Sequence, residues 1–321
     1  MPKTVMGYVL RFSGWHQAGL AALSAAVFLL SAVPLELQRR IVNDLIGKGS
    51  FTAVFWLAVI YAGVALAEQG LKLALNVYRG WVAEKSVREL RTLIYEGEVR
   101  AAGASPSSLD TGVEIAMILD EAEPIGGFVG ISVSEPLLQG GILASVIGYM
   151  VFLEARLALL GIAFFLPQMV FVPLLQHAIN VRARERILVK REIGGAIAES
   201  SHGAGDVASQ TGAIGRVFSL NMGIYWRKYS MNLLMNLMYH LGVAAVLCFG
   251  GWLALAGRIE IGTVVAMVGG LAKLNDPWGD LVNWAREFSV VSVKYRLYAG
   301  AANWLLGGSE PVSPSAAPLA T

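Results

Sequence analysis

The sequence predicts an all-α membrane protein with six long transmembrane helices and two cytoplasmic helical hairpins. The chain has 321 residues, of which 55% are hydrophobic and only 15% are charged. Soluble domains are about 25% charged, so this composition excludes an ordinary soluble protein. Six apolar stretches have the length of about 20 residues that crosses a hydrocarbon core of about 30 Å. They are residues 15–35, 51–75, 131–153, 157–177, 232–256 and 263–282.

Two polar arms, residues 79–130 and 178–230, separate pairs of these apolar stretches. If each arm belongs to a long antiparallel helical hairpin, its tip lies midway between the outer ends of that hairpin. The two midpoints fall near Ala102 and Val207, both within Gly- and Ser-rich stretches that are typical of turns. The apolar residues of the first arm also have helical spacing. We therefore expect tall helical hairpins that project from the membrane.

The distribution of basic residues predicts the orientation. With a cytosolic N-terminus, residues 1–14 and the two arms carry 15 Lys and Arg, against 5 in the loops on the other side. Basic residues accumulate on the cytoplasmic side of membrane proteins, so both termini are expected in the cytoplasm, with the chain in a bacterial inner (plasma) membrane. The basic residues serve as topological anchors, so they do not indicate a nucleic-acid partner.

The chain is expected to divide into three parts. Residues 1–14 form an interfacial helix, residues 15–306 form the six-helix domain, and residues 307–321 form a disordered tail rich in Pro, Ser and Ala. One cysteine, Cys248, excludes an intramolecular disulfide. The four histidines are scattered and have no metal-ligand spacing, so no metal site is expected.

The sixth apolar stretch carries a polar face. Lys273, Asp276, Asp280, Asn283 and Glu287 recur at spacings of three and four, which keeps them on one side of a helix. A helix entering near residue 262 would place the first of them about 16 Å deep and the third about 27 Å deep. Charges at such depths face a bundle interior or a water-filled cavity. Two interpretations stay open: a substrate path, or an internal ion-pair set between the lysine and the two aspartates.

Other polar residues in the spans have weaker patterns. Asn236 and His240 mark a polar edge of the fifth span, where hydrogen bonding between helices is favoured over a place in the substrate path. Glu68 and Lys72 are four residues apart in the order that favours an ion pair, and we expect them to neutralise each other. Pro277 removes a backbone donor and predicts a bend in the sixth helix.

Several segments resemble the membrane domains of ATP-binding-cassette (ABC) exporters. Val87-Arg-Glu-Leu-Arg-Thr-Leu-Ile-Tyr95 is similar to a signature that follows their second span, and Gly112 precedes Asp120 at a similar spacing. Residues 257–267, Pro277 and residues 292–296 resemble the connection to the sixth helix and that helix itself. The resemblance extends over about residues 5–306. It implies the ABC exporter transmembrane fold.

The resemblance also implies partners. In this family, short coupling helices at the hairpin tips dock on nucleotide-binding domains, which bind ATP and Mg²⁺. The implied partners are thus an ABC nucleotide-binding protein and a second copy or homologous transmembrane subunit, within membrane lipid. The corresponding coupling residues here are Leu109, Asp110, Thr111 and Gly112 in the first tip, and Gly205, Asp206 and Val207 in the second.

The phosphate-binding motif Gly-x-x-x-x-Gly-Lys-[Ser/Thr] does not occur in the sequence. The chain is therefore expected to have no ATPase site and no cofactor of its own. The nucleotide-binding domain would be a separate polypeptide, absent from a fragment, or lost. Two other functions stay open: an ion-coupled secondary transporter, and a non-transporting membrane scaffold or immunity protein with the same fold.

Overall fold

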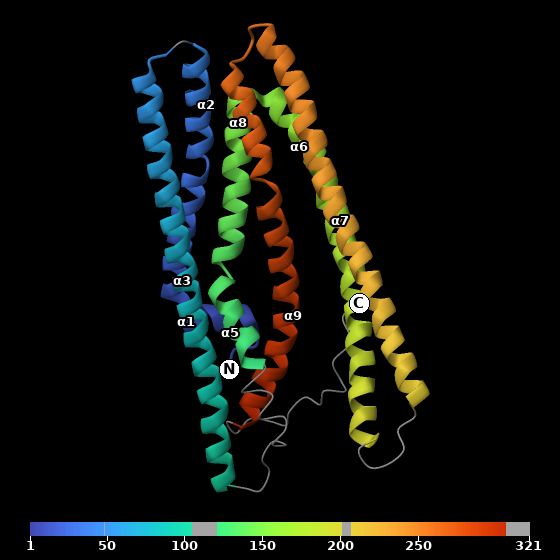
Figure 1. Ribbon diagram of the computed structural model, residues 1–321. Coiled ribbons are helices and arrows are strands. Elements are labelled where there is room, and N and C mark those ends of the chain that lie inside the picture. Colours follow the sequence, from blue (N-terminus) through green and yellow to red (C-terminus); the bar gives the residue numbers. More distant parts are fainter. Residues whose placement is uncertain (48, 105–120, 201–206, 306–321) are drawn as a thin grey trace. The chain divides into compact units, whose positions relative to one another are not determined.

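The computed structural model describes residues 1–47, 49–104, 121–200 and 207–305, and every regular element in this part of the chain is a helix (Figure 1). The elements are α1 (Val5–Ser31), α2 (Val33–Ile46), α3 (Phe51–Ala104), α5 (Ala122–Ile131), α6 (Ser134–Ser200), α7 (Val207–Leu255), α8 (Ile261–Ala272) and α9 (Asn275–Leu305).

Four stretches of helix are long and apolar enough to cross a membrane. They are Val5–Ile46, Phe51–Gly97, Ala122–Lys190 and Gln210–Leu255. The first four predicted spans lie within these stretches, and the fifth does so except for its last residue, 256. The third and fourth spans share the third stretch, which contains α5 and most of α6. The predicted sixth span lies outside all four stretches. The all-helical membrane class is confirmed, while the full set of six spans stays a prediction.

The helices form two compact units, which are described separately. Unit 1 comprises Met1–Tyr149 and Asp276–Thr321, and unit 2 comprises Met150–Asn275. The chain thus enters unit 2 within α6 and returns to unit 1 at the start of α9.

In unit 1, α3 and α5 pack with their backbones in close contact. A Cβ atom at Gly126 would lie 2.3 Å from Val87 Cγ2, and one at Gly130 would lie 2.5 Å from the carbonyl oxygen of Arg79. Only glycine fits such an approach. Apolar side chains on the two helices are also buried, and Val82, Leu90 and Phe128 are at most 1% exposed.

Hydrogen bonds from small polar side chains hold α1 in unit 1. The helix is interrupted at Ser13, which has a non-helical backbone and whose hydroxyl donates to the carbonyl of Val9 (2.8 Å). Gln17 is buried and donates to Ser13 Oγ and to the carbonyl of Val129. Two turns further along α1, Ser24 donates to the carbonyl of Ser134. Such contacts join helices where lipid supplies no hydrogen-bond partner.

Buried tyrosines tie the C-terminal half of α9 to the start of the chain and to α3. Tyr295 donates to the carbonyl of Pro2 (2.9 Å), and Tyr298 donates to the carbonyl of Leu90 (2.7 Å). Burial raises the pKa of the Tyr298 phenol, so this side chain remains a neutral donor. Both rings are fully buried.

In unit 2, α6 and α7 run antiparallel in constant register, side by side in Figure 1. Leu157 faces Gly250, and Arg186 Nη1 donates to Asn221 Oδ1 (3.1 Å). The two contacts are separated by the same number of residues on each helix, 157 to 186 on α6 and 250 to 221 on α7, so the register between the helices does not shift. The extended backbone of Glu154 (φ −160°, ψ 101°) interrupts α6 where the sequence predicts a loop between spans.

The end of α7 has a well-defined stop signal. Gly257 adopts φ 68°, and the amide of Arg258 donates to the carbonyl of Leu253 (3.0 Å). This is the hydrogen bond of a Schellman motif, which needs a left-handed residue that glycine supplies best. The predicted loop after residue 256 is therefore confirmed, and α8 begins four residues later.

The predicted sixth helix is not continuous. α8 ends at Ala272, Lys273 and Leu274 form a turn, and α9 begins at Asn275. Pro277 lies in the first turn of α9 and has no amide hydrogen to donate to the carbonyl of Lys273, which explains the break. The sequence predicts a bend at this proline, but the chain instead starts a new helix.

Candidate functional site

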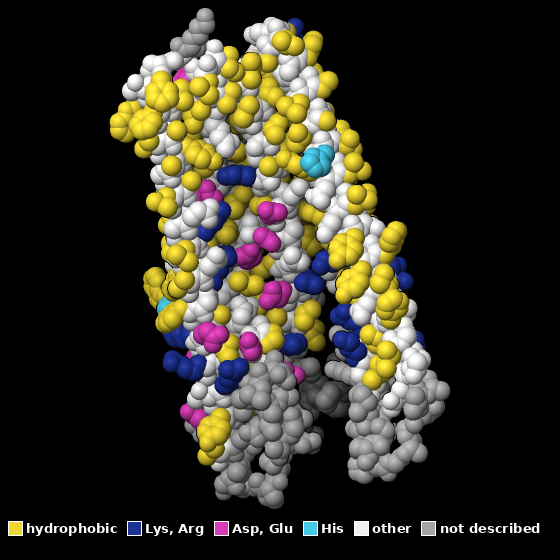
Figure 2. Space-filling view, viewed as in Figure 1, with side chains coloured by type: hydrophobic (Ala, Val, Ile, Leu, Met, Phe, Trp, Pro, Cys, Tyr) yellow, Lys and Arg dark blue, Asp and Glu magenta, His cyan; other side chains and the backbone are white. Residues whose placement is uncertain are grey.

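The polar face of α9 lies in unit 1. Asp276, Asp280 and Asn283 are exposed, and Glu287 is half-buried. Figure 2 shows acidic side chains gathered over the middle of this unit. Burial raises the pKa of Glu287, and the neighbouring charge of Arg286 opposes the shift. These four residues share one face because their spacing of three and four is preserved within α9.

Lys273 lies outside α9. It caps the end of α8, whereas the four other residues lie on α9. The prediction that one continuous helix carries all five residues is therefore wrong. The depths that it assigned along one straight helix do not hold either, because the helix axis is interrupted after Ala272.

Asp280 is hydrogen-bonded to a glutamine on a neighbouring helix. Gln139 Nε2 on α6 donates to Asp280 Oδ2 (3.0 Å) and to Glu135 Oε1 (2.8 Å). One amide group thus connects two carboxylates from different helices. Because the amide is neutral, this contact leaves the negative charge of Asp280 available to a ligand.

A buried ion pair continues this network toward α3. Arg79 Nη1 lies 2.6 Å from Glu135 Oε2, with side chains that are 10% and 15% exposed. Arg79 Nε also donates to Ser134 Oγ (2.8 Å). Its Nη2 atom is buried without a hydrogen-bond partner among the described residues. We call Arg79, Ser134, Glu135, Gln139 and Asp280 the charged network of unit 1.

Sequence reasoning missed most of the charged network. The sequence predicts Arg79 at the start of a cytosolic arm, and no motif distinguishes Glu135 within the third span. A usable signal existed, because Glu135 and Gln139 are four residues apart in an apolar stretch and so share one helix face. The pairing of Arg79 with Glu135 joins α3 to α6, and no local pattern encodes that contact.

Asn236 and His240 lie on α7 in unit 2, and both are exposed. His240 contacts the ring of Tyr239 (centroids 5.1 Å apart). The sequence pattern favours hydrogen bonds from these two residues to other helices. Within the described part of the chain neither residue makes such a bond. Their place in a substrate path stays a prediction.

Glu68 and Lys72 neutralise each other, as their spacing predicts. Lys72 Nζ lies 2.7 Å from Glu68 Oε1, and the glutamate side chain is only 8% exposed. In the described residues, no group of three His, Cys, Asp or Glu side chains could hold a metal ion.

The sequence matches a known family over residues 13–211, which is more than half of the chain. The family is the ABC transporter transmembrane region. This chain belongs to that family. No curated protein matches the chain. The family resemblance inferred from the motifs is therefore confirmed, and the chain is an integral membrane protein with an ABC transporter membrane domain.

Most of the coupling residues predicted for this ABC membrane domain lie outside the described part of the chain. These are Leu109, Asp110, Thr111, Gly112, Gly205 and Asp206. Val207 is the first residue of α7. The helices that lead to both segments are described, and each pair runs antiparallel.

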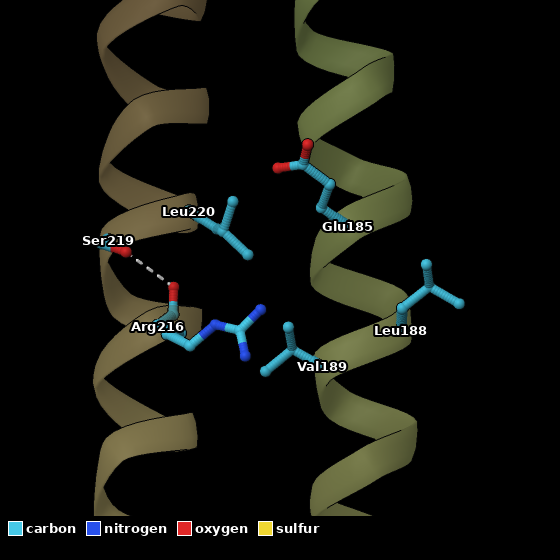
Figure 3. A pocket seen from close by; sticks show the side chains of 6 residues that line it. All are labelled: Glu185, Leu188, Val189, Arg216, Ser219 and Leu220. Carbon is cyan, nitrogen blue, oxygen red and sulfur yellow. Dashed lines mark hydrogen bonds between the residues drawn. The ribbon is translucent and has the colours of Figure 1, made fainter.

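A cavity of about 370 Å³ lies between α6 and α7 of the ABC membrane domain (Figure 3). It is lined by Glu185, Leu188, Val189, Arg216, Ser219 and Leu220. The guanidinium group of Arg216 extends toward Val189 on the facing helix, and Ser219 donates to the carbonyl of Arg216 (2.9 Å). Four of these six residues are exposed, so the space is a groove that is open to the surface beside the two helices.

Proposed function

We propose that this chain is the membrane-spanning subunit of an ATP-driven ABC exporter, with six spans and two cytoplasmic helical hairpins. The observation that carries the proposal is that two long helices run antiparallel to the helix that follows each of them, α3 to the short α5 and α6 to the long α7, in a member of the ABC transmembrane family. α3 alone has 54 residues, about 80 Å at 1.5 Å each, against a bilayer core of about 30 Å. The excess length suits levers that reach a soluble partner.

The partner in this proposal is a separate nucleotide-binding protein, which holds ATP and Mg²⁺. Two membrane subunits, identical or homologous, form the working transporter. Hydrolysis on the partner moves the hairpin tips, and the hairpins transmit that motion to the spans, which open alternately to the two sides. This chain supplies the path and the levers and hydrolyses no ATP itself.

The exposed face of α9 is the part of the chain that best suits a substrate path. Asp276, Asp280 and Asn283 are exposed on a helix of an integral membrane protein, and exposed charges in such helices avoid lipid. Asn236 and His240 on α7 are further candidates for this path. The proposal does not include Lys273 in the α9 face.

An ATPase measurement tests the proposal. The chain, a cassette ATPase encoded beside it, and the two together are reconstituted in liposomes. We expect the chain alone to hydrolyse ATP no faster than a mock preparation, and to stimulate the ATPase when both are present. Hydrolysis by the chain alone, or the absence of stimulation, would refute the proposal.

A charge reversal at a predicted coupling residue sharpens this test. Asp110→Arg should abolish the stimulation, because the residue is expected to face the ATPase. Asp44→Arg is the matched control. Asp44 lies near the end of α2, and the predicted orientation places it on the side of the membrane opposite to the hairpin tips. Equal effects of both changes would argue against docking at the first tip.

The proposed orientation has its own measurement. Single cysteines replace Ser107 or Ala155 in a Cys248→Ala background, and intact cells are treated with an impermeant thiol reagent. Ala155 should be labelled and Ser107 should not, because the charge distribution places the arms inside the cell. The opposite labelling would invert the topology.

A further inference from the structure

Five side chains of α1 and α3 form a compact group at one surface of unit 1. They are Phe12, His16, Tyr78, Trp81 and Lys85. Lys85 Nζ lies 5.3 Å from the ring centre of Trp81 and 5.8 Å from that of Phe12. His16 packs edge-on against Trp81 (centroids 5.1 Å apart), and Trp81 stacks on Tyr78 (6.2 Å). We call this group the cationic–aromatic cluster.

The hydrogen bonds of the cluster fix its donors. His16 Nδ1 lies 2.9 Å from the hydroxyl oxygen of Tyr78, and His16 Nε2 lies 3.3 Å from Lys85 Nζ. An ammonium group can only donate, so Nε2 accepts, and the neutral ring then carries its hydrogen on Nδ1 and donates it to Tyr78. This arrangement leaves the Tyr78 hydroxyl hydrogen and two ammonium hydrogens of Lys85 for another acceptor.

The charge of Lys85 is not neutralised by a carboxylate. Glu89, one turn further along α3, is close enough to interact electrostatically with Lys85, but the two form no ion pair in the described part of the chain. The two aromatic rings stabilise the cation without cancelling its charge. Histidine accepts a hydrogen bond from it and adds no negative charge. The cluster therefore presents a net positive charge with free donors.

The surface next to the cluster changes from polar to apolar along one line. Leu73, Val77, Trp81 and Lys85 follow one another at intervals of four residues, so they share one face of α3. Leu73 is 67% exposed, Val77 is 64% exposed and Trp81 is 50% exposed. The cluster also coincides with the predicted boundaries of the first two spans, near residues 15 and 75. Tryptophan and tyrosine are enriched at this level of a membrane.

We propose that the cationic–aromatic cluster binds the headgroup of an anionic phospholipid. A phosphate oxygen accepts hydrogen bonds from Lys85 and the Tyr78 hydroxyl, while an acyl chain lies along Val77 and Leu73. The sequence of cation, aromatic ring and apolar residues on α3 matches the order of groups in a phospholipid. A headgroup with a net negative charge neutralises the positive charge of Lys85. A zwitterionic headgroup carries no net charge and therefore neutralises it less well. This site is independent of the proposed transport function.

Native mass spectrometry of the full chain in detergent tests the proposal. The chain is titrated with phosphatidylglycerol and with phosphatidylcholine of the same acyl chains. We expect one phosphatidylglycerol to bind about tenfold more tightly than phosphatidylcholine, the size of effect that a charge-assisted hydrogen bond provides. A large excess of glycerol 3-phosphate should not displace the lipid. Equal binding of the two lipids, or displacement by glycerol 3-phosphate, would overturn the lipid site.

Variants locate the site. Lys85→Met keeps the side-chain stem but removes the charge, and it should lower phosphatidylglycerol affinity to that of phosphatidylcholine. Lys228→Met is the matched control, because Lys228 is an exposed lysine between the exposed Trp226 and Tyr229 on α7. It should leave the lipid preference unchanged. An equal loss in both variants would show only a general attraction of basic residues to anionic lipid, and would refute the cluster.

A second variant keeps the test valid if Lys85→Met does not fold. Tyr78→Phe preserves the ring contacts with Trp81 and His16 and removes the hydroxyl, which donates to the phosphate and accepts from His16 Nδ1. It should weaken phosphatidylglycerol binding about two- to tenfold, as expected for one hydrogen bond to the phosphate. An unchanged phosphatidylglycerol affinity in Tyr78→Phe would contradict the assigned role of that hydroxyl.

Discussion

The two antiparallel helix pairs of this chain are held together in different ways. Between α3 and α5, backbone lies against backbone at Gly126 and Gly130, and buried apolar side chains close the space. Between α6 and α7, a Cβ atom at Gly223 would meet the flexible side chain of Arg182 (2.9 Å to Nε) instead of backbone. A groove of about 370 Å³, open to the surface, also lies between the helices of the second pair along its arm.

The two pairs also differ in how their charged residues are paired. Arg79 on α3 of the first pair is buried against Glu135 at the start of α6, whereas Arg186 of the second pair donates to the neutral amide of Asn221. The first pair thus combines tight packing with an ion pair that joins α3 to the neighbouring α6, and the described contact between polar side chains of the second pair involves one charged group only. We infer that the first arm behaves as a rigid extension of unit 1, and that the second arm can change its internal spacing at low cost.

The largest expected effect of a single change concerns the buried ion pair that joins α3 of the first pair to the start of α6. Glu135→Gln should destabilise the chain by about 3–5 kcal/mol, because it leaves the buried guanidinium of Arg79 without a counter-charge. Thermal unfolding in detergent measures the loss. The double variant Arg79→Met/Glu135→Gln should recover much of it, since both charges are then removed.

The second helix pair provides the matched control for this change. Asn221→Ala removes the partner of Arg186, which should cost only about 0.5–1.5 kcal/mol, the value of one ordinary hydrogen bond. A loss in Asn221→Ala as large as that in Glu135→Gln would show that both pairs depend equally on their polar contacts.

The next effect in size concerns the glycine contact of the first pair. Gly130→Ala should destabilise the chain by about 1–3 kcal/mol, because the new Cβ atom would lie 2.5 Å from the Arg79 carbonyl oxygen and the helices must separate. Gly127→Ala is the control on the same helix, where a Cβ atom meets nothing within 4 Å. It should leave thermal stability unchanged or raise it. A harmless Gly130→Ala would disprove the tight packing.

Much of the helical organisation is predictable from the sequence. Hydropathy alone identifies the all-helical membrane class and places the break at Glu154 in the gap between two apolar stretches. Gly257 marks the end of α7, because local backbone chemistry determines where a helix stops. The same applies to the ion pair of Glu68 with Lys72, whose partners are one turn apart. These features depend on residues that are close together in the sequence.

The charged network of unit 1 was not predictable in the same way. Its contacts join Arg79, Glu135 and Asp280 from three helices, and helical periodicity gives the face of a residue but not the helix that packs against it. The break between α8 and α9 shows a second limit. Pro277 indicates a disturbance, yet the choice between a bend and a new helix depends on tertiary packing.

A smaller effect is expected from filling the cavity of the second pair. Ser219→Leu introduces an apolar side chain into space bordered by Leu188, Val189 and Leu220. Thermal stability should stay within about 1 kcal/mol of the wild type, because the added burial offsets the lost hydrogen bond of Ser219 to its own helix. A loss of several kcal/mol would mean that α6 and α7 are as closely packed as α3 and α5.

The smallest effect on stability is expected at Asp280. Asp280→Asn should change the unfolding temperature little, since the side chain is exposed and its asparagine oxygen can still accept from Gln139. If the α9 face lines a substrate path, transport should nevertheless change, because a charge facing that path is lost. Transport by reconstituted subunits and thermal unfolding of the same preparation measure the two properties separately. A marked loss of stability with unchanged specific transport would instead place Asp280 with Arg79 and Glu135, as a structural member of the charged network.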